Sequence, residues 1–330
     1  MTLRIATRRS ALALAQTRWV AARIRALHPD VPIEEVHVVT EGDRVLDRPL
    51  SAVGGKGLFV AEVEAALRDG RADLAVHSMK DVPAELAPGC AIVAVPERED
   101  PRDVLVTPDG AELDALPAAA RVGTSSLRRV CQLRRARPDL DYATLRGNVD
   151  TRLRRLDEGR FAAIVLALAG LRRLDLATRP LHVLSPELCI PAAGQGALAL
   201  EARDDDERVR ALVAPLDDPR TRASVDAERA FLARLEGGCK TPIAAHLSWH
   251  DGGARVRFDA MVASFDGERM LTGSSERWTE PHAHAGPPGR LADTLREMAL
   301  EVAEALLSRG AGDLVREARA AAWRAQTGLS

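Results

Sequence analysis

Arginines lie beside small-residue turns at many points along this chain. A guanidinium next to free backbone N–H groups is well suited to binding carboxylate or phosphate groups. The total charge nearly cancels, because 46 Lys and Arg residues face 48 Asp and Glu residues and leave a formal net charge of -2. The cations are therefore placed locally, and they predict a protein that binds a polyanionic small molecule. The arginines concerned are Arg8, Arg9, Arg128, Arg129, Arg146, Arg152, Arg154, Arg155, Arg172 and Arg173.

A carboxylate follows a cation directly at Lys80 and Asp81, at the end of the apolar segment Leu74–Met79. Among cations, Asp81 is expected to stay ionised. It could then stabilise a developing positive charge or pass a proton to a departing amine. Taken alone, the pair is more typical of a structural ion pair.

Cys239 lies in the glycine-rich segment Leu235–Pro242, between two glycines and Lys240. A neighbouring ammonium favours the thiolate, which is the reactive form of cysteine. Most unpaired cysteines are buried and inert, but the glycines and the lysine favour an exposed, reactive thiol here. The four cysteines show no CxxC spacing, so they indicate neither a zinc site nor a disulfide framework. Those in apolar or helical surroundings are predicted to be inert: Cys90, Cys131 and Cys189.

Hydroxyl side chains precede a predicted helix at Gly123–Ser126. Hydroxyls and unbonded N–H groups at a helix start bind anions well. Arg128 and Arg129 fall in the first turn, where the helix dipole disfavours cations by about 0.3–1 kcal/mol each. A bound anion would reverse that penalty, so the segment predicts an anion site. A solvated basic helix face is the alternative.

The elements that must position these groups alternate between short apolar runs and amphipathic stretches, a pattern typical of parallel α/β architecture. In such sheets ligands bind outside the carboxyl ends of the strands. Polar turn residues assigned to those ends predict one shared cleft: Arg8, Ser10, Lys80, Asp81, Thr124, Ser126, Arg146, Arg173 and Gln195. The predicted strands are Leu3–Ala6, Val36–Thr40, Asp73–Met79, Arg121–Gly123, Tyr142–Leu145, Ala162–Leu168 and Ala197–Glu201. The predicted helices are Ser10–Leu27, Phe59–Arg68, Leu127–Ala136, Val149–Asp157 and Gly170–Leu174.

Two proline-rich crossings, Pro96–Pro101 and Pro186–Pro191, divide this region into two α/β lobes. The simplest topology takes the chain into the second lobe and back. It predicts a first domain of residues 1–96 plus 197–215 and a second domain of residues 102–190. A third domain, residues 219–330, is predicted to be a small α+β unit. Its predicted elements are a helix at Ser224–Leu235, antiparallel strands around Ala254–Val262 and Glu268–Ser274, a helix at Arg290–Leu307 and a helical tail.

Several classes of function are disfavoured. The chain has no net positive charge and few aromatic residues among its basic ones, which argues against a nucleic-acid partner. The first residues lack an apolar core of signal-peptide length, and the longest apolar run, Phe161–Leu171, is too short to span a bilayer. We therefore expect a cytoplasmic protein. No metal site is predicted, because His246 with His250, and His282 with His284, lack a carboxylate or thiol partner.

Seven segments, in order along the chain, resemble the porphobilinogen deaminase family of tetrapyrrole biosynthesis, also known as hydroxymethylbilane synthases. The resemblance runs from about Arg4 to about Leu307. The segments are Val53–Phe59, Val76–Pro83, Glu97–Asp103, Val122–Arg129, Leu145–Asn148, Pro191–Gly196 and Leu235–Cys239. Chance agreement across seven ordered segments is negligible.

The resemblance implies three domains, the first two arranged like a two-lobed (type II) periplasmic binding protein. It implies that Cys239 carries a dipyrromethane cofactor through a thioether, as the anchor for chain growth. The implied reaction condenses four porphobilinogen molecules stepwise, each with loss of ammonia, and then releases hydroxymethylbilane by hydrolysis. Each pyrrole carries an acetate and a propionate, so several charge-assisted hydrogen bonds, at about 1.5–3 kcal/mol each, would hold the growing chain. The protein is expected to act as a monomer.

By the same resemblance, Asp81 is the catalytic residue, which assists deamination and stabilises cationic azafulvene and pyrrole-nitrogen intermediates. The implied cofactor-binding positions are Ser78, Lys80, Asp81, Thr124, Ser126, Arg128, Arg129, Arg146, Gly147 and Arg152. The implied substrate-binding positions are Arg8, Ser10, Gln16, Arg128, Arg129, Arg146, Arg152, Arg173 and Gln195. Lys56 and Phe59 match a lid loop and its hinge. Ala52 stands where relatives often carry lysine, and Arg9 replaces a common glutamine.

Two other functions fit parts of the pattern. A non-enzymatic two-lobed binding protein for an anionic metabolite would share the lobes and the arginines. Such proteins usually carry an export signal, however, and they need no reactive cysteine. A phosphate-handling transferase is disfavoured, because Gly54–Gly57 lacks the spacing of a P-loop and no metal-binding carboxylate cluster is evident.

Overall fold

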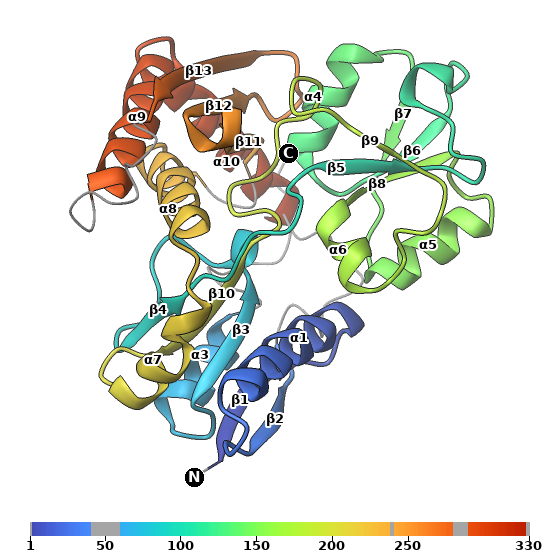
Figure 1. Cartoon of the computed structure of the whole chain (residues 1–330). Coiled ribbons are helices and arrows are strands. Elements are labelled where there is room, and N and C mark those ends of the chain that lie inside the picture. Colours follow the sequence, from blue (N-terminus) through green and yellow to red (C-terminus); the bar gives the residue numbers. More distant parts are fainter. Residues whose placement is uncertain (1, 41–59, 238–240, 280–289, 328–330) are drawn as a thin grey trace.

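Three sheets with their covering helices form the architecture (Figure 1). The computed structural model describes residues 2–40, 60–237, 241–279 and 290–327. Two five-stranded sheets form the two lobes, and a three-stranded antiparallel sheet belongs to the third unit. The predicted fold class, two α/β lobes followed by a small α+β domain, is confirmed.

The first lobe is built on the sheet β2-β1-β3-β10-β4. Its strands are β1 (Leu3–Arg8), β2 (Ile33–Val38), β3 (Leu74–Ser78), β4 (Cys90–Ala94) and β10 (Leu198–Arg203). The strands β1, β2 and β3 run parallel, whereas β10 runs antiparallel to β3 and β4. The sequence pattern predicted a parallel sheet, but the sheet is mixed. The reason is that the chain returns from the second lobe at the carboxyl end of β3 and therefore enters the sheet in the reverse direction.

Helices cover both faces of this sheet. The helix α1 (Ala11–Leu27) begins at Ser10, whose Oγ accepts a hydrogen bond from the Ala13 N–H at 3.3 Å. Apolar side chains of α1 and α7 (Glu207–Val213) pack on one face, and those of α3 (Ala61–Arg68) pack on the other. The Ser10 cap fixes where α1 starts, directly after the end of β1.

The second lobe is built on the sheet β7-β6-β8-β5-β9. Its strands are β5 (Asp103–Val106), β6 (Arg121–Gly123), β7 (Asp141–Ala143), β8 (Ala163–Ala167) and β9 (Leu181–Val183). Its helices are α4 (Leu127–Ala136), α5 (Val149–Asp157) and α6 (Leu168–Arg173). The strand β6 pairs in parallel with β7 and β8, while β5 is antiparallel to its two neighbours. The helices α6 and α1 lie against each other where the two lobes meet.

The third unit packs three helices on a meander. Its strands are β11 (Ile243–His250), β12 (Arg255–Ala263) and β13 (Met270–Trp278), and its helices are α8 (Pro219–Arg234), α9 (Arg290–Leu307) and α10 (Ala311–Thr327). Phe231 and Phe258 meet in the core with ring centroids 5.5 Å apart. Short 3-10 helices complete the elements: η2 (Met79–Asp81), η3 (Leu113–Ala115), η4 (Ala214–Leu216) and η5 (Asp251–Gly253). None of the described helices has the length and apolar character that a membrane span needs.

One buried carboxylate joins the third unit to both crossings between the lobes. Glu228 of α8 accepts hydrogen bonds from Arg98 in the outgoing crossing, at 2.7 and 3.1 Å. It also accepts from the Gly194 N–H, just after the returning crossing, at 2.7 Å and from the Leu247 N–H of β11 at 2.9 Å. Burial alone would raise the pKa of Glu228, but Arg98 and His246 outweigh burial and lower this pKa to about 2. The carboxylate therefore stays ionised and holds the three parts together.

Replacing Glu228 with Gln should leave the Arg98 guanidinium buried without a counter-charge. We expect the free energy of unfolding to fall by about 3–5 kcal/mol, measured by equilibrium denaturant unfolding. In the unchanged protein, the stability that Glu228 contributes should be complete above about pH 4.5 and be lost as the pH falls through about 2. The control is Glu304→Gln, which removes an exposed partner of Arg234 and should cost less than about 1 kcal/mol. Equal losses in the two variants would contradict this account.

Candidate active site

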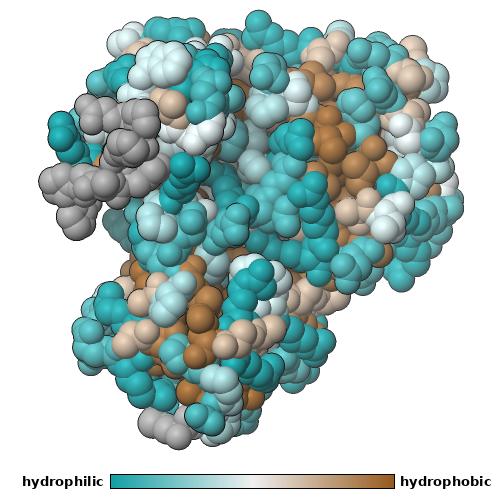
Figure 2. All heavy atoms as spheres, in the orientation of Figure 1, coloured by the Kyte–Doolittle hydropathy of each residue, from teal (hydrophilic) through white to brown (hydrophobic). Residues whose placement is uncertain are grey.

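A cavity of about 580 Å³ lies between the two lobes, at the carboxyl ends of β1, β3 and β8. Side chains from both sheets and from α1, α4, α5 and α6 converge on it. The surface where the first lobe meets the rest of the molecule is mainly hydrophilic (Figure 2). The predicted site residues that line the cavity are Arg8, Ser10, Gln16, Ser78, Lys80, Asp81, Arg129, Arg146, Gly147, Arg152 and Arg173.

Four predicted site residues lie beside this cavity without lining it. Thr124 and Ser126 form the start of α4, where the Thr124 Oγ1 accepts from the Ser126 N–H at 3.2 Å and the Ser126 Oγ accepts from the Arg129 N–H at 3.5 Å. Arg128 and Gln195 are buried. Gln195 precedes β10 instead of following a strand, so its assignment to a carboxyl end is wrong. Because Leu198 of β10 pairs with Ser78 of β3 in antiparallel register, Gln195 still lies at the same edge of the sheet.

Asp103, the first residue of β5, is the functional candidate that sequence reasoning missed. It is fully buried, and its Oδ2 lies 2.7 Å from the Arg128 Nη2. Its Oδ1 accepts from the Arg129 Nε at 3.0 Å and from the Arg129 Nη2 at 2.7 Å. Burial would raise the pKa of Asp103, but Arg128 and Arg129 hold it far below its ordinary value. Its only sequence signal was its place at the end of the motif Glu97–Asp103.

Lys80 follows β3 and donates from its Nζ to the Gln195 Oε1 at 3.2 Å. The residue keeps part of its surface accessible, but protein atoms enclose its ammonium group. That desolvation lowers the pKa of Lys80 to about 8, with Asp81 and Asp103 opposing the change and Arg129 and Arg128 adding to it. The ammonium is therefore charged at neutral pH and close to its titration point.

Cationic side chains outnumber carboxylates among the residues that line the cavity. Burial, followed by the charges of Arg129 and Arg146, lowers the pKa of Arg152 to about 10. Burial also lowers the pKa of Arg173 to about 10, although Glu99 opposes it. Carbonyl groups hold these two side chains in place, because Arg152 donates to the Gly147 carbonyl at 2.8 Å and Arg173 to the Gly196 carbonyl at 2.7 Å. A cavity with surplus guanidinium charge fits a ligand that carries carboxylates.

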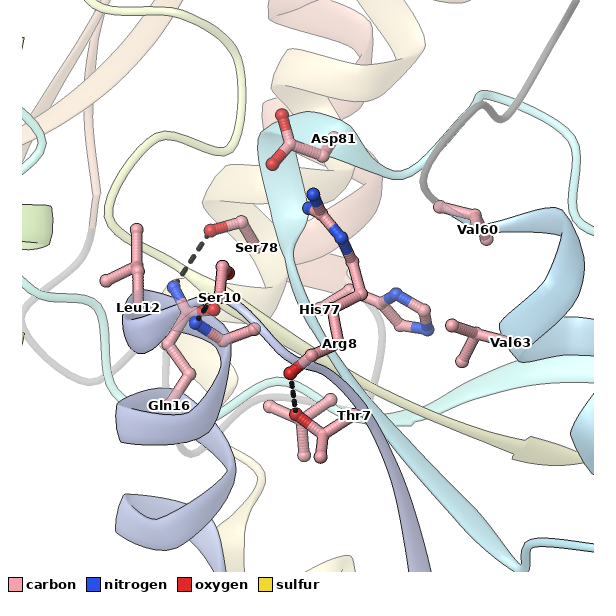
Figure 3. Close-up of a pocket in the computed structure, with 12 residues that line it drawn as sticks. Thr7, Arg8, Ser10, Leu12, Gln16, Val60, Val63, His77, Ser78 and Asp81 are labelled. Carbon is pink, nitrogen blue, oxygen red and sulfur yellow. Dashed lines mark hydrogen bonds between the residues drawn. The ribbon is translucent and has the colours of Figure 1, made fainter. Parts of the chain in front are cut away.

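A smaller hollow of about 60 Å³ adjoins the cleft beside Asp81 (Figure 3). The Arg8 guanidinium extends from the end of β1 toward the Asp81 carboxylate (Figure 3). The Gln16 Nε2 donates to the Ser78 Oγ at 2.9 Å. His77 lines the same hollow and lies 2.9 Å from Glu201, which is buried in β10. Asp81 thus lines both the cleft and this smaller hollow.

Several predicted positions lie outside the described residues. They are Cys239, the proposed lid residues Lys56 and Phe59, and Ala52. The segment that holds Cys239 follows α8, after a turn in which the Gly237 N–H donates to the Leu232 carbonyl at 2.8 Å. A Cβ on Gly237 would lie 2.6 Å from the Ile243 Cδ1, so a larger residue there would require that side chain to shift. Burial raises the pKa of Cys90 and Cys131 to about 11 and that of Cys189 to about 12, as expected of unreactive thiols.

Comparison with known proteins gives a consistent picture. Residues 3–211 match the family model described as porphobilinogen deaminase, dipyromethane cofactor binding domain, and residues 223–306 match porphobilinogen deaminase, C-terminal domain. The chain is 50% identical to a porphobilinogen deaminase of Syntrophotalea carbinolica, over 94% of this chain and 93% of that protein. It is 56% identical to one of Sorangium cellulosum, over 81% and 89% of the respective chains. Among solved structures, the methionine-binding protein MetQ is a distant likeness, with 13% identity and a TM-score of 0.43 over 67% of this chain and 92% of that chain.

Lys80 offers a direct test of the electrostatics of the cleft, since lysine occurs only at positions 56, 80 and 240 of the chain. We expect amine labelling of Lys80, followed by peptide mass spectrometry, to reach half its maximal rate at about pH 8. Full-length protein with Cys239→Ser should be used, so that nothing is attached at that position. A midpoint at the ordinary lysine value of about 10.4 would contradict the enclosed, cation-rich environment.

Proposed function

The chain belongs to the porphobilinogen deaminase family, and we propose that its cleft condenses four porphobilinogen molecules stepwise, each with loss of ammonia, before hydrolysis releases hydroxymethylbilane. The enzyme is a transferase of tetrapyrrole and haem biosynthesis. The observation that carries this function is the surplus of cations between the lobes, where Lys80, Arg152 and Arg173 all have lowered pKa values. Each porphobilinogen brings an acetate and a propionate that would neutralise them.

A dipyrromethane cofactor suits this donor set. When bound, the group supplies the pyrrole carbon onto which the first substrate is joined. Arg129, Arg146 and Arg152 line the cavity and would hold its carboxylates, together with Lys80 and Ser78. Thr124 and Ser126 would act by fixing the start of α4, and Gly147 by leaving room at the start of α5. We propose Cys239 as the attachment point, through a thioether.

Asp81 is proposed as the catalytic residue. Its carboxylate lines both the cleft and the smaller hollow, with the Arg8 guanidinium directed toward it. A carboxylate at this point would stabilise positive charge that develops on a substrate pyrrole as the amine departs, and it could hold the proton that moves in that step. The smaller hollow beside it has room for the ammonia that the reaction releases and the water that hydrolysis consumes.

The substrate side of the cleft is proposed to be Arg8, Ser10, Gln16 and Arg173, which come from β1, α1 and α6. Arg8 and Arg173 approach from different lobes, so they could bind the carboxylates of one incoming pyrrole from two directions. Arg128 and Gln195 are buried, and their contribution would pass through the residues that they contact.

We further propose that the enzyme works in the cytoplasm as a monomer, without nucleic acid or membrane as a partner. The near-zero net charge supports the exclusion of nucleic acid. The three domains are proposed to be residues 1–96 with 197–215, residues 102–190 and residues 219–330. A binding protein without catalytic activity would share the lobes, but it would carry no covalent group.

Intact-protein mass spectrometry tests the covalent group. The purified protein should exceed its translated mass by two condensed porphobilinogen units, and Cys239→Ser should remove this increment. Cys90→Ser is the matched control, because that thiol is proposed to be unreactive, and it should keep the increment. Active protein at its translated mass would refute the proposed function.

Asp81→Ala should keep the added mass but lose turnover by about 10²–10⁴-fold, because it removes only the stabilising carboxylate. Turnover is measured as hydroxymethylbilane formed from porphobilinogen. Asp150→Ala serves as the control, since Asp150 of α5 is another carboxylate that lines the cleft, and it should retain at least a tenth of the turnover. Substantial product from Asp81→Ala would remove Asp81 from the mechanism.

A further inference from the structure

We propose that Asp103 and Gln195 are positioning residues, in which the buried Asp103 carboxylate fixes the Arg129 guanidinium of the second lobe and, through the Gln195 amide, the Lys80 ammonium of the first lobe. We call this chain of contacts the Asp103–Gln195 relay. The inference rests on the proposed function, because it concerns the placement of the cations that would hold pyrrole carboxylates. It assigns a role to two side chains that do not line the cleft.

The relay begins at the first residue of β5, directly after the outgoing crossing. Both oxygens of Asp103 are engaged, Oδ2 with Arg128 and Oδ1 with Arg129. Arg129 is further fixed by a hydrogen bond from its Nη1 to the Val165 carbonyl at 2.9 Å. Three contacts of 3.0 Å or less therefore set the plane of the guanidinium of Arg129, a residue that lines the cleft.

Gln195 connects Asp103 to Lys80 of the first lobe. Its Nε2 donates to the Asp103 Oδ1 at 2.8 Å and to the Pro101 carbonyl at 2.6 Å, so both amide protons are used. A flipped amide would place an oxygen against two acceptors, which fixes its orientation. The Oε1 must then face the Lys80 Nζ, which donates to it at 3.2 Å. One carboxylate thus determines the position of a cation on each side of the cleft.

The contact with Gln195 matters for the pKa of Lys80, because charges of both signs surround the Lys80 ammonium. Asp81 and Asp103 favour the charged ammonium, while Arg129 and Arg128 disfavour it, and burial disfavours it most. Removing the amide oxygen of Gln195 takes away an acceptor from an enclosed cation. Lys80 should then lose its proton at lower pH and point less consistently into the cleft. A purely structural amide, which only filled space between the crossings, would have no such effect on Lys80.

Gln195→Met tests the relay, because it keeps side-chain length, removes the hydrogen bonds and introduces no buried charge. In full-length protein with Cys239→Ser, we expect the midpoint of Lys80 labelling to fall by about one pH unit, the usual effect of losing a hydrogen bond to a charged group. Gln132→Met is the matched control. Gln132 of α4 is also buried, and its amide bonds the Ile190 backbone at 2.8 and 3.2 Å and donates to the Arg128 carbonyl at 3.2 Å, but none of these contacts involves Asp103, Gln195 or Lys80. It should leave the Lys80 midpoint unchanged.

A second measurement uses protein with Cys239 intact. The fraction of purified Gln195→Met protein that carries the dipyrromethane mass should fall at least threefold relative to Gln132→Met. The fraction of Asp103→Asn protein that carries the dipyrromethane mass should be lower still than that of Gln195→Met. With Cys239→Ser, the Asp103→Asn protein should show the same fall in the midpoint of Lys80 labelling. If Asp103→Asn does not fold, the measurements on Gln195→Met alone test the relay.

The outcomes separate the relay from the proposed function. An unchanged Lys80 midpoint in Gln195→Met, or an equal shift in Gln132→Met, would overturn the relay while wild-type protein still carried its adduct. Wild-type protein without an adduct would instead overturn the proposed function, and the labelling result would stand independently.

Discussion

A cleft that gathers cations can persist in a folded protein only if buried carboxylates neutralise part of their charge. Asp103 meets this requirement for Arg128 and Arg129, and it is the contact from which the cleft is organised. Its single negative charge faces two guanidiniums, so it cannot also neutralise Lys80 or Arg152. Burial lowers the pKa values of these two groups, and neighbouring guanidiniums lower them further. The same surplus of positive charge lets the cleft bind carboxylates and costs the fold stability.

The charge balance and the arrangement of the domains are determined at the same place. Asp103 closely follows the outgoing crossing, while Glu228 binds Arg98 in that crossing and the Gly194 N–H just after the returning one. Gln195, next to Gly194, reaches both Asp103 and Lys80. A movement of one lobe relative to the other would therefore act on the same short segments that position the cations. The geometry of the cleft and the geometry of the crossings cannot vary independently.

Local signals in the sequence predicted the helices best. The bounds of α4, α5 and α9 agree with the prediction, since each combines a clear start with an amphipathic pattern. The strands β4, β5 and β9 were not predicted, because their partners are remote in sequence and short apolar runs do not reveal direction. The strand β11 was not predicted either, although its partner β12 follows it directly in the chain. The cleft lining followed from polar turns at strand ends. Asp103 could not be found in this way, since an acidic residue at the start of a strand gives no sign that two arginines more than twenty residues away will enclose it.

The place of β10 in the first sheet has a consequence for biosynthesis. It lies between β3 and β4, yet it follows the entire second lobe in the chain. A ribosome must therefore release residue 203 before the first sheet can close, whereas the strands of the second sheet all fall within residues 103–183. The second lobe can mature while the first still exposes the open edges of β3 and β4. Nascent chains of this protein consequently pass through an interval in which those edges are available for aberrant strand pairing or for chaperones.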